Sequence, residues 1–408
     1  MRMIFLAAAL CALAPGADAA PLPHWVASWG TAQMDPGPEA PPPAQWNDVT
    51  LRQVVHVTLA ARTVRVRFSN AFGTEPLAID AASLALVAAD TVPASMRLLR
   101  FGGSTGVVIP AGAEYASDPV ELPHAAGADL AVALHLAAAP SRITGHPGAG
   151  ATSFIAPGNH VRESRWPAGG TQVGGWFQLA AIEVLADAGA HSVAAIGDSI
   201  TDGYGSTVDG NDRWPDVLAA RLRAAGMGQV GVVNAGITGN RLLRDGRGPN
   251  LAGRFARDVL ARAGVSHVIV MIGVNDFGMQ HRDHEDTPAA RAALLAALEA
   301  AHRQLAAQAH ARGICVLGAT ITPYAGGADY RPSADNESDR QTYNDWIRNA
   351  GVFDGVIDFD AALRDPGHPQ LLRAAFDNDG LHPSVPGYRA MAAEVPLESL
   401  AKCVIKSH

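Results

Sequence analysis

The sequence predicts an α/β protein in which an antiparallel β-sandwich precedes a domain with a parallel sheet. Between Trp29 and Phe177 the chain has short Val-, Thr- and Leu-rich runs and no long helical period. After residue 190, near-continuous apolar runs alternate with longer helical stretches, which is typical of a parallel sheet covered on both faces. The length of 408 residues fits two domains of roughly 100–200 residues each.

The first 20 residues have the layout of a secretory signal peptide. Arg2 gives a positive start, Met3 to Leu13 form a short apolar run, and residues 17–19 (ADA) form a small-residue cleavage signal. We expect cleavage after residue 19 or 20, and therefore a secreted or periplasmic protein. The expected organisation is a signal peptide at 1–20, a jelly-roll-like β-sandwich at 21–188 and the α/β domain at 189–408.

Composition excludes several classes of protein. With 48% hydrophobic and 17% charged residues, the chain is too apolar for general disorder. The formal net charge of −8 leaves no basic excess to neutralise phosphates, which argues against a nucleic-acid partner. No segment after the signal reaches the ~18 uncharged apolar residues of a membrane span, so stable membrane insertion is not expected.

The first part contains the predicted sandwich strands. The run from Thr63 to Phe68 alternates apolar and polar residues, as a strand with one buried face does. Turn residues separate the runs, and the proline-rich segment 36–43 is expected to be an irregular surface loop. The predicted strands are 53–59, 63–68, 77–87, 96–101 and 130–136.

The second part contains the elements of the predicted parallel sheet. Ligands of such sheets bind beyond the carboxyl ends of the strands, so the residues that follow each strand are the ones to examine for chemistry. The predicted strands are 192–196, 230–234, 267–272, 314–321 and 355–359, and the predicted helices are 214–225, 252–263, 289–311 and 338–350.

Ser199 directly follows the first of these strands, within the segment Gly197-Asp198-Ser199. A serine there exposes its hydroxyl at the carboxyl edge of the sheet, and it becomes a nucleophile only when a base removes its proton. The alternative is that Ser199 caps the helix that follows, because Ser and Asp are preferred at helix N-termini.

The candidate base lies near the C-terminus. Asp379 precedes His382 by three residues in a loop that contains Gly and Pro, so the carboxylate can reach the imidazole Nδ1 and leave Nε2 free to face a serine. The alternative is that both residues make ordinary turn hydrogen bonds. Together with Ser199, the pair predicts a triad in the chain order Ser, Asp, His.

Two further strand ends offer donors for an oxyanion hole. Gly236 follows the second strand and could present a backbone N–H without an obstructing side chain. Asn275 follows the third strand, and its side-chain amide could donate a second hydrogen bond. Each of these residues is alternatively a simple turn or cap residue, but the four pieces fall at strand ends as a set.

These four blocks resemble the SGNH hydrolase superfamily, also called GDSL-type esterases and lipases. The matching segments are Gly197-Asp198-Ser199, Gly236, Gly273-Val274-Asn275-Asp276 and Asp379-Gly380-Leu381-His382-Pro383. The resemblance implies a three-layer α/β/α, flavodoxin-like fold that hydrolyses carboxylic esters without a cofactor. It also implies Ser199 as nucleophile, His382 as base, Asp379 as its orienter, and an oxyanion hole formed by Ser199, Gly236 and Asn275.

The N-terminal part is similar to secreted bacterial GDSL-type proteins that carry a β-sandwich, some of which are associated with xylan breakdown. The similar segments are 24–32, 51–53 and 64–70. This resemblance implies an esterase for acetyl groups on carbohydrates, with a small-molecule or polysaccharide ester as substrate. A lipase or broad-specificity arylesterase is the alternative, and a non-catalytic polysaccharide-binding protein is an alternative of another class. Trp166 and Trp176 are candidate sugar platforms or core residues.

The cysteines and one polar cluster remain. After cleavage only Cys315 and Cys403 are left; they can form one bridge in an oxidising compartment, or Cys315 can be a free thiol in its apolar run. Their spacing does not suggest a metal site.

The segment 281–286 (HRDHED) contains metal-ligand residue types, but adjacent residues rarely reach one ion and Arg282 disfavours it, so a solvated loop and no metal are expected.

Overall fold

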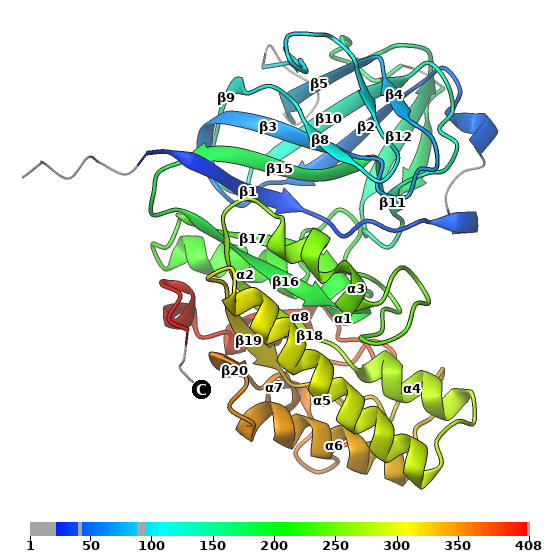
Figure 1. Ribbon diagram of the computed structural model, residues 1–408, viewed down its shortest axis with the longest axis vertical. Helices are drawn as coiled ribbons and strands as arrows, with labels where there is room; N and C mark the ends of the chain where they lie inside the picture. The colour runs from blue at the N-terminus through cyan, green and yellow to red at the C-terminus, as the bar shows by residue number, and fades with distance from the viewer. Residues whose placement is uncertain (1–21, 40–42, 88–94, 168, 406–408) are drawn as a thin grey trace, which may run out of the picture.

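The computed structural model describes residues 22–39, 43–87, 95–167 and 169–405 (Figure 1). The first part of the chain pairs antiparallel and the last part pairs parallel, and the change falls between Ala186 and His191. The predicted fold class is therefore confirmed. The predicted signal peptide lies outside the described residues. Within the described part of the chain, no helix is long and apolar enough to cross a bilayer.

Two antiparallel sheets form the sandwich. Their strands are β1 (His24–Gly30), β2 (Val49–His56), β3 (Ala61–Ser69), β5 (Ala81–Leu86), β6 (Arg97–Leu98), β8 (Glu114–Ala116), β9 (Val120–His124), β10 (Asp129–Leu136), β12 (Thr152–Pro157), β13 (Thr171–Gly174) and β15 (Leu179–Ala186). One sheet has the order β1-β15-β3-β8, with β9 also paired to β3, and the other has the order β13-β12-β2-β10-β5-β6.

The strand predicted at 63–68 shows why this part folds as a sandwich. In β3, Val64, Val66 and Phe68 are buried while the residues between them are partly exposed, as the alternation predicts. The buried side chains of both sheets form one apolar core. The bulk of the sandwich therefore derives its stability from burial between two half-apolar sheets.

Two predicted runs were too long. The run 77–87 is divided into β4 (Leu77–Ile79) and β5, because β4 pairs with β7 (Val107–Ile109) while β5 pairs with β10. Asp80 stands at the break, and its side chain accepts a hydrogen bond from Ala137 N. In the run 96–101 only β6 pairs as a strand. The proline-rich segment contains the short 3-10 helices η1 (Gly37–Glu39) and η2 (Pro43–Trp46), whereas 40–42 lie outside the described residues.

The parallel sheet has the order β17-β16-β18-β19-β20, in which the first strand lies between the second and the third. Its strands are β16 (His191–Gly197), β17 (Val230–Gly236), β18 (Val265–Met271), β19 (Cys315–Ala319) and β20 (Gly355–Ile357). This is the flavodoxin-like order, which reverses direction beside β16 and opens a crevice there. All five predicted strands are confirmed, although β20 is shorter than expected.

Helices cover both faces of this sheet, which makes three layers (Figure 1). The helix predicted at 252–263 is a short α-helix that continues as one π-helical turn, and the other three predicted helices are confirmed. One face packs against α3 (Leu251–Phe255), η3 (Ala256–Leu260), α4 (Val274–Arg282), α5 (Pro288–His310) and α6 (Ala334–Asn349), and the other against α2 (Trp214–Ala224), α7 (Phe359–Leu363) and α8 (Val385–Glu394).

Strand β1 joins the two parts of the chain. It belongs to the sandwich but runs beside β17, between the two parts of the molecule (Figure 1). Ala27 N donates to Ala263 O at 2.8 Å, and Ser192 Oγ donates to Ala27 O at 2.5 Å. Ala27, Ala32 and Met34 are buried in the core of the α/β part. The sandwich is thus packed onto the sheet that carries the predicted site.

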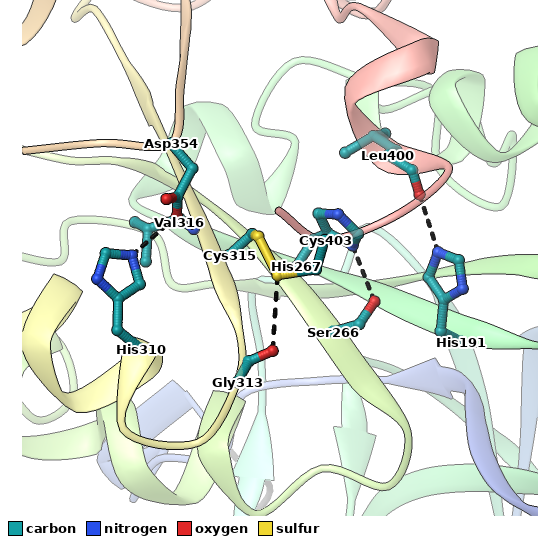
Figure 2. The surroundings of a disulfide bond; sticks show 10 residues. All are labelled: His191, Ser266, His267, His310, Gly313, Cys315, Val316, Asp354, Leu400 and Cys403. Carbon is teal, nitrogen blue, oxygen red and sulfur yellow. Dashed lines mark hydrogen bonds and ion pairs between the residues drawn. A yellow bond between two sulfur atoms is a disulfide. The ribbon is translucent and has the colours of Figure 1, made fainter. Parts of the chain in front are cut away.

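A disulfide joins Cys315, the first residue of β19, to Cys403 near the C-terminus (Figure 2). Their Cα atoms are 5.4 Å apart. The structure thereby decides the pairing that the sequence left open. His267 lies beside the two sulfurs, but because the sulfurs are bonded to each other the cluster is a cross-link that ties the C-terminal segment to the sheet.

Candidate active site

Ser199 is the first residue of the short helix α1 (Ser199–Asp202), directly after β16. The tight turn depends on Gly197, because a Cβ there would lie 2.4 Å from Met271 O on the neighbouring strand. Asp198 caps the helix: its Oδ1 accepts a hydrogen bond from Ile200 N at 3.0 Å. Asp198, not Ser199, is therefore the cap residue, and the Ser199 hydroxyl is available for another partner.

That partner is His382. Ser199 Oγ lies 2.8 Å from His382 Nε2, and His382 Nδ1 lies 2.8 Å from Asp379 Oδ2. The three side chains that the sequence singled out therefore form one hydrogen-bonded relay, in which the serine and the histidine are 183 positions apart in the sequence. Ser199 is 3% exposed and His382 is 8% exposed, whereas the Asp379 side chain is 39% exposed, so only the serine–histidine end of the relay is closed to solvent.

The loop holds Asp379 in its ionised form. Its Oδ1 accepts the backbone N–H groups of Leu381 at 3.1 Å and His382 at 2.8 Å. Partial burial raises the pKa of this carboxyl, but the hydrogen bonds from the His382 backbone and imidazole outweigh it, so the net pKa is lowered. An ionised Asp379 fixes the imidazole with Nδ1 protonated and Nε2 as the acceptor of the serine proton.

Tyr204 covers the histidine. Its ring centroid lies 4.3 Å from that of His382 at an interplanar angle of 38°. The Tyr204 carbonyl accepts a hydrogen bond from the Tyr388 hydroxyl at 2.6 Å, which anchors the loop after α1 to α8. Tyr204 itself is half exposed, so it forms part of the surface around the relay. The sequence does not identify this residue, because a single tyrosine in a loop belongs to no recognisable sequence motif.

The two other predicted oxyanion donors, Ser199 and Asn275, each lie at the start of a helix that follows a strand of the parallel sheet. The Ser199 N–H lies in the first turn of α1 and has no partner within the described residues. The Asn275 side chain is buried at the start of α4, where its Nδ2 donates to Asn240 O at 2.8 Å and its Oδ1 accepts from the Tyr330 hydroxyl at 2.6 Å. These two bonds define which end of the amide is nitrogen, and the second N–H has no further partner among the residues that the structure describes.

Gly236 does not offer the donor that the sequence predicted. Its N–H already donates to Asn234 Oδ1 at 2.9 Å, and a Cβ on it would lie 2.2 Å from Asp202 N, so it is a close-packing glycine against α1. Among the described residues, the N–H of Gly239 has no hydrogen-bond partner. Gly239 has φ +72° in a turn closed by Asn240 N donating to Ile237 O, which needs Gly at its third position. That turn chemistry is the sequence signal that identifies Gly239.

Arg254 ties these loops together. It is 1% exposed, and its guanidinium donates to Gly197 O at 2.9 Å, Ala235 O at 2.6 Å and Asn240 Oδ1 at 3.0 Å. It therefore connects the ends of β16 and β17 with Asn240, whose carbonyl oxygen accepts the hydrogen bond from Asn275 Nδ2. Asp258, 3.0 Å from the Arg254 guanidinium, supplies the opposite charge. No motif marks Arg254 in the sequence.

The remaining polar and aromatic candidates lie elsewhere. Within the segment 281–286, His281 Nδ1 is 2.5 Å from Asp286 Oδ2. Glu285 instead pairs with Arg244, outside the segment, at 3.2 Å. These side chains therefore do not converge on one point. Trp176 is 4% exposed and packs edge-on against Trp29, which makes it a core residue and not a platform. Trp166 is partly buried and lies under the Arg52 guanidinium.

The comparisons with known proteins concern the α/β part of the chain. Residues 195–390 match the model of the GDSL-like Lipase/Acylhydrolase family. Similar solved structures include a GDSL-like lipase from Bacteroides thetaiotaomicron, with 19% sequence identity, coverage of 52% of this chain and 87% of that chain, and a TM-score of 0.36. An acetyl xylan esterase, AlAXEase, has 22% identity, coverage of 50% and 96%, and a TM-score of 0.37. A variant of an acetyl xylan esterase from Geobacillus stearothermophilus has 22% identity, coverage of 53% and 97%, and a TM-score of 0.38.

No curated protein matches the chain by sequence comparison. The family match spans β16 to α8 and includes the serine, asparagine and histidine blocks described above. Residues 195–390 therefore form a GDSL-like lipase/acylhydrolase domain, which makes the protein a carboxylic ester hydrolase.

Proposed function

We propose that the chain is a secreted serine esterase that removes short acyl groups, above all acetyl, from carbohydrates such as xylan through an acyl-enzyme. The observation that carries this proposal is the continuous relay from Ser199 Oγ through His382 to Asp379, with both steps at 2.8 Å. A serine whose hydroxyl donates to a carboxylate-oriented imidazole is activated for attack on an ester carbonyl.

In the first half-reaction, His382 Nε2 takes the proton of Ser199 as Oγ bonds to the carbonyl carbon. The carbonyl oxygen becomes an oxyanion that accepts hydrogen bonds from Ser199 N–H, Gly239 N–H and Asn275 Nδ2, each worth about 10²–10³ in rate. The tetrahedral intermediate collapses as the ester C–O bond breaks, and the proton on Nε2 passes to the leaving alkoxide. The products are the free alcohol and an acyl-serine.

In the second half-reaction, water takes the place of the alcohol. His382 Nε2 removes a proton from water as its oxygen attacks the acyl carbon, and the proton is then returned to Ser199 Oγ as the acyl C–O bond breaks. The carboxylic acid leaves and the hydroxyl is regenerated.

The burial of the catalytic side chains supports a small acyl group. Ser199 and His382 are 3% and 8% exposed, so a small group is placed against Oγ with less displacement of the surrounding side chains than a long acyl chain. Export is supported by the N-terminal sequence pattern and by the Cys315–Cys403 disulfide, which is typical of an oxidising compartment.

The test is hydrolysis of p-nitrophenyl esters from acetyl to dodecanoyl, followed by acetylated xylan. We expect the acetyl ester to give the highest kcat/KM, Ser199→Ala to lose turnover, and the matched control Ser206→Ala on the same loop to keep it. A maximum at long chains would indicate a lipase or broad arylesterase instead. No turnover on any ester would contradict the proposal and favour a polysaccharide-binding protein.

A further inference from the structure

A histidine of the sandwich reaches the helix that carries the nucleophile. His146 lies in β11 (Gly145–His146), and its Nε2 is 2.8 Å from Asp202 Oδ1 in α1. The two side chains are 4% and 2% exposed, so this contact is buried between the two parts of the chain. Neither residue touches the relay, and nothing in the mechanism above uses them.

Asp202 passes this contact on to the oxyanion turn. Its other oxygen, Oδ2, accepts hydrogen bonds from Thr238 N at 2.8 Å and from Thr238 Oγ1 at 2.7 Å. Thr238 directly precedes Gly239, whose N–H has no hydrogen-bond partner in the described part of the chain. One carboxylate oxygen therefore holds Thr238 by its N–H and its hydroxyl, one residue before the N–H of Gly239, and the other oxygen is held by His146.

The sandwich holds His146 firmly. Its backbone pairs with Trp176 in β14 (Trp176–Phe177), and its ring stacks on that indole at a centroid distance of 6.2 Å and an angle of 21°. Arg213 also lies over this indole, 5.6 Å from its centroid, and donates to Ala149 O at 3.0 Å. The imidazole is thus clamped by groups from both parts of the chain.

The approach is close enough to require glycine. A Cβ at Gly148 would lie 2.6 Å from Asp202 Oδ2 and 3.1 Å from Thr238 Oγ1. The loop that follows His146 therefore lies directly against the carboxylate and the threonine that it holds. This is a second contact between the sandwich and the same turn, independent of the imidazole.

We propose that His146 is a positioning residue for the oxyanion hole: through Asp202 and Thr238 it sets the orientation of the Gly239 N–H. This inference rests on the proposed function. An Nε2–H that donates to Asp202 keeps the carboxylate turned so that Oδ2 faces Thr238. Without that donor, the carboxylate rotates and the turn that presents Gly239 loosens. The sandwich thus completes the catalytic site, in addition to any binding of substrate.

The test compares His146→Leu with His146→Gln in the full chain. Leu removes the donor, whereas the Gln amide places an N–H near the position of Nε2. We expect His146→Leu to lower kcat for p-nitrophenyl acetate about ten- to hundred-fold, as for a misplaced catalytic group, with KM within about two-fold. The inhibition constant of a trifluoromethyl ketone, which forms a tetrahedral adduct, should rise by the same factor as kcat falls. His146→Gln should recover most of both losses.

His135→Leu is the matched control. His135 is also buried in the sandwich and lies 3.1 Å from the carboxylate of Asp48, but away from the site. The His135→Leu variant should have a lower melting temperature than the parent, but the same kcat at temperatures below its unfolding transition. A kcat of His146→Leu equal to that of His135→Leu, or no recovery in His146→Gln, would overturn the proposal.

Gly148→Ala gives a separate measurement if His146→Leu does not fold. Its Cβ presses on Asp202 Oδ2, so kcat should fall while KM holds, and an unchanged kcat would overturn the proposal. The two hypotheses fail differently. A parent protein that hydrolyses no ester contradicts the proposed function, whereas an active parent with an unaffected His146→Leu contradicts only the role of His146.

Discussion

The hydroxyl of Tyr330 determines how the Asn275 amide is oriented, and Tyr330→Phe tests this by removing one oxygen atom. In the protein this hydroxyl donates to Asn275 Oδ1 at 2.6 Å, while Asn275 Nδ2 donates to Asn240 O at 2.8 Å. With Tyr330 gone as donor, the amide oxygen is left buried without a partner, because Asn275 is 2% exposed. The amide can then rotate away from the oxyanion position.

The magnitude follows from the hydrogen bond. Leaving a buried acceptor unpaired costs about 1–3 kcal/mol, so the free energy of unfolding should fall by that amount. If about 1.4 kcal/mol of it is lost in the transition state, kcat falls about tenfold. The loss must remain below the about 10²–10³ expected for Asn275→Ala, which removes the donor itself.

The assay is steady-state hydrolysis of p-nitrophenyl acetate together with thermal unfolding. Tyr324→Phe is the matched control, because Tyr324 packs against Tyr330 at a centroid distance of 6.4 Å and is fully buried, but its hydroxyl has no partner among the described residues. It should keep the parental kcat and unfold at the same or a higher temperature. Parental kcat and stability in Tyr330→Phe, or equal losses in both variants, would refute the assignment of the Asn275 amide.

Three further predictions concern other parts of the molecule. Asp379→Asn should lower kcat about 10⁴-fold, because the imidazole loses the carboxylate that holds its tautomer. Single-turnover kinetics measures this step, and an unchanged rate would contradict the prediction. Burial raises the pKa of Asp198 to about 7, so between about pH 4 and pH 7 the folded state keeps a proton that the unfolded state has lost, and stability falls as the pH rises. Asp198→Asn should flatten this part of a calorimetric pH profile, and an equally steep profile would exclude Asp198 as its source. The Cys315–Cys403 disulfide closes a loop with a sequence separation of 88, so its reduction should lower the free energy of unfolding, measured by denaturant titration, by up to about 4–5 kcal/mol. The kcat should stay unchanged, because Cys315 lies at the opposite end of its strand from the site. A lower kcat would contradict that placement.

The sequence was sufficient to predict the fold class and the relay because both depend on local patterns. Alternation in the run 63–68 and the apolar runs after residue 190 each specify one kind of strand, and the strand ends then bring Ser199 to the crevice. The acid three residues before His382 is within reach through its own loop. These signals lie within a few residues of one another, so no knowledge of packing was needed.

The oxyanion loop was harder to predict, because its donors depend on tertiary contacts. Gly236 ends β17 and Gly239 lies in the turn that follows, and only the positions of Asn234 and α1 show that the N–H of Gly236 is already used. Arg254 and His146 carry no local signal at all. His146 lies in a segment rich in glycine, and the role proposed for it follows only from the docking of the sandwich on α1.

The pairing of the cysteines shows a similar limit. An apolar run around Cys315 is compatible with a buried thiol or a buried disulfide, because both are apolar. Only the path of the C-terminal segment, which returns to the start of β19, brings Cys403 within bonding distance of Cys315.

The central claim is that Ser199 becomes acylated. The most direct measurement is to treat the protein with a fluorophosphonate, which reacts only with an activated serine, and to map the adduct by peptide mass spectrometry. We predict one adduct per chain, on the peptide that contains Ser199, absent from Ser199→Ala and strongly slowed in Asp379→Asn. Modification of a different serine, or an unlabelled parent protein that still hydrolyses esters, would contradict the account.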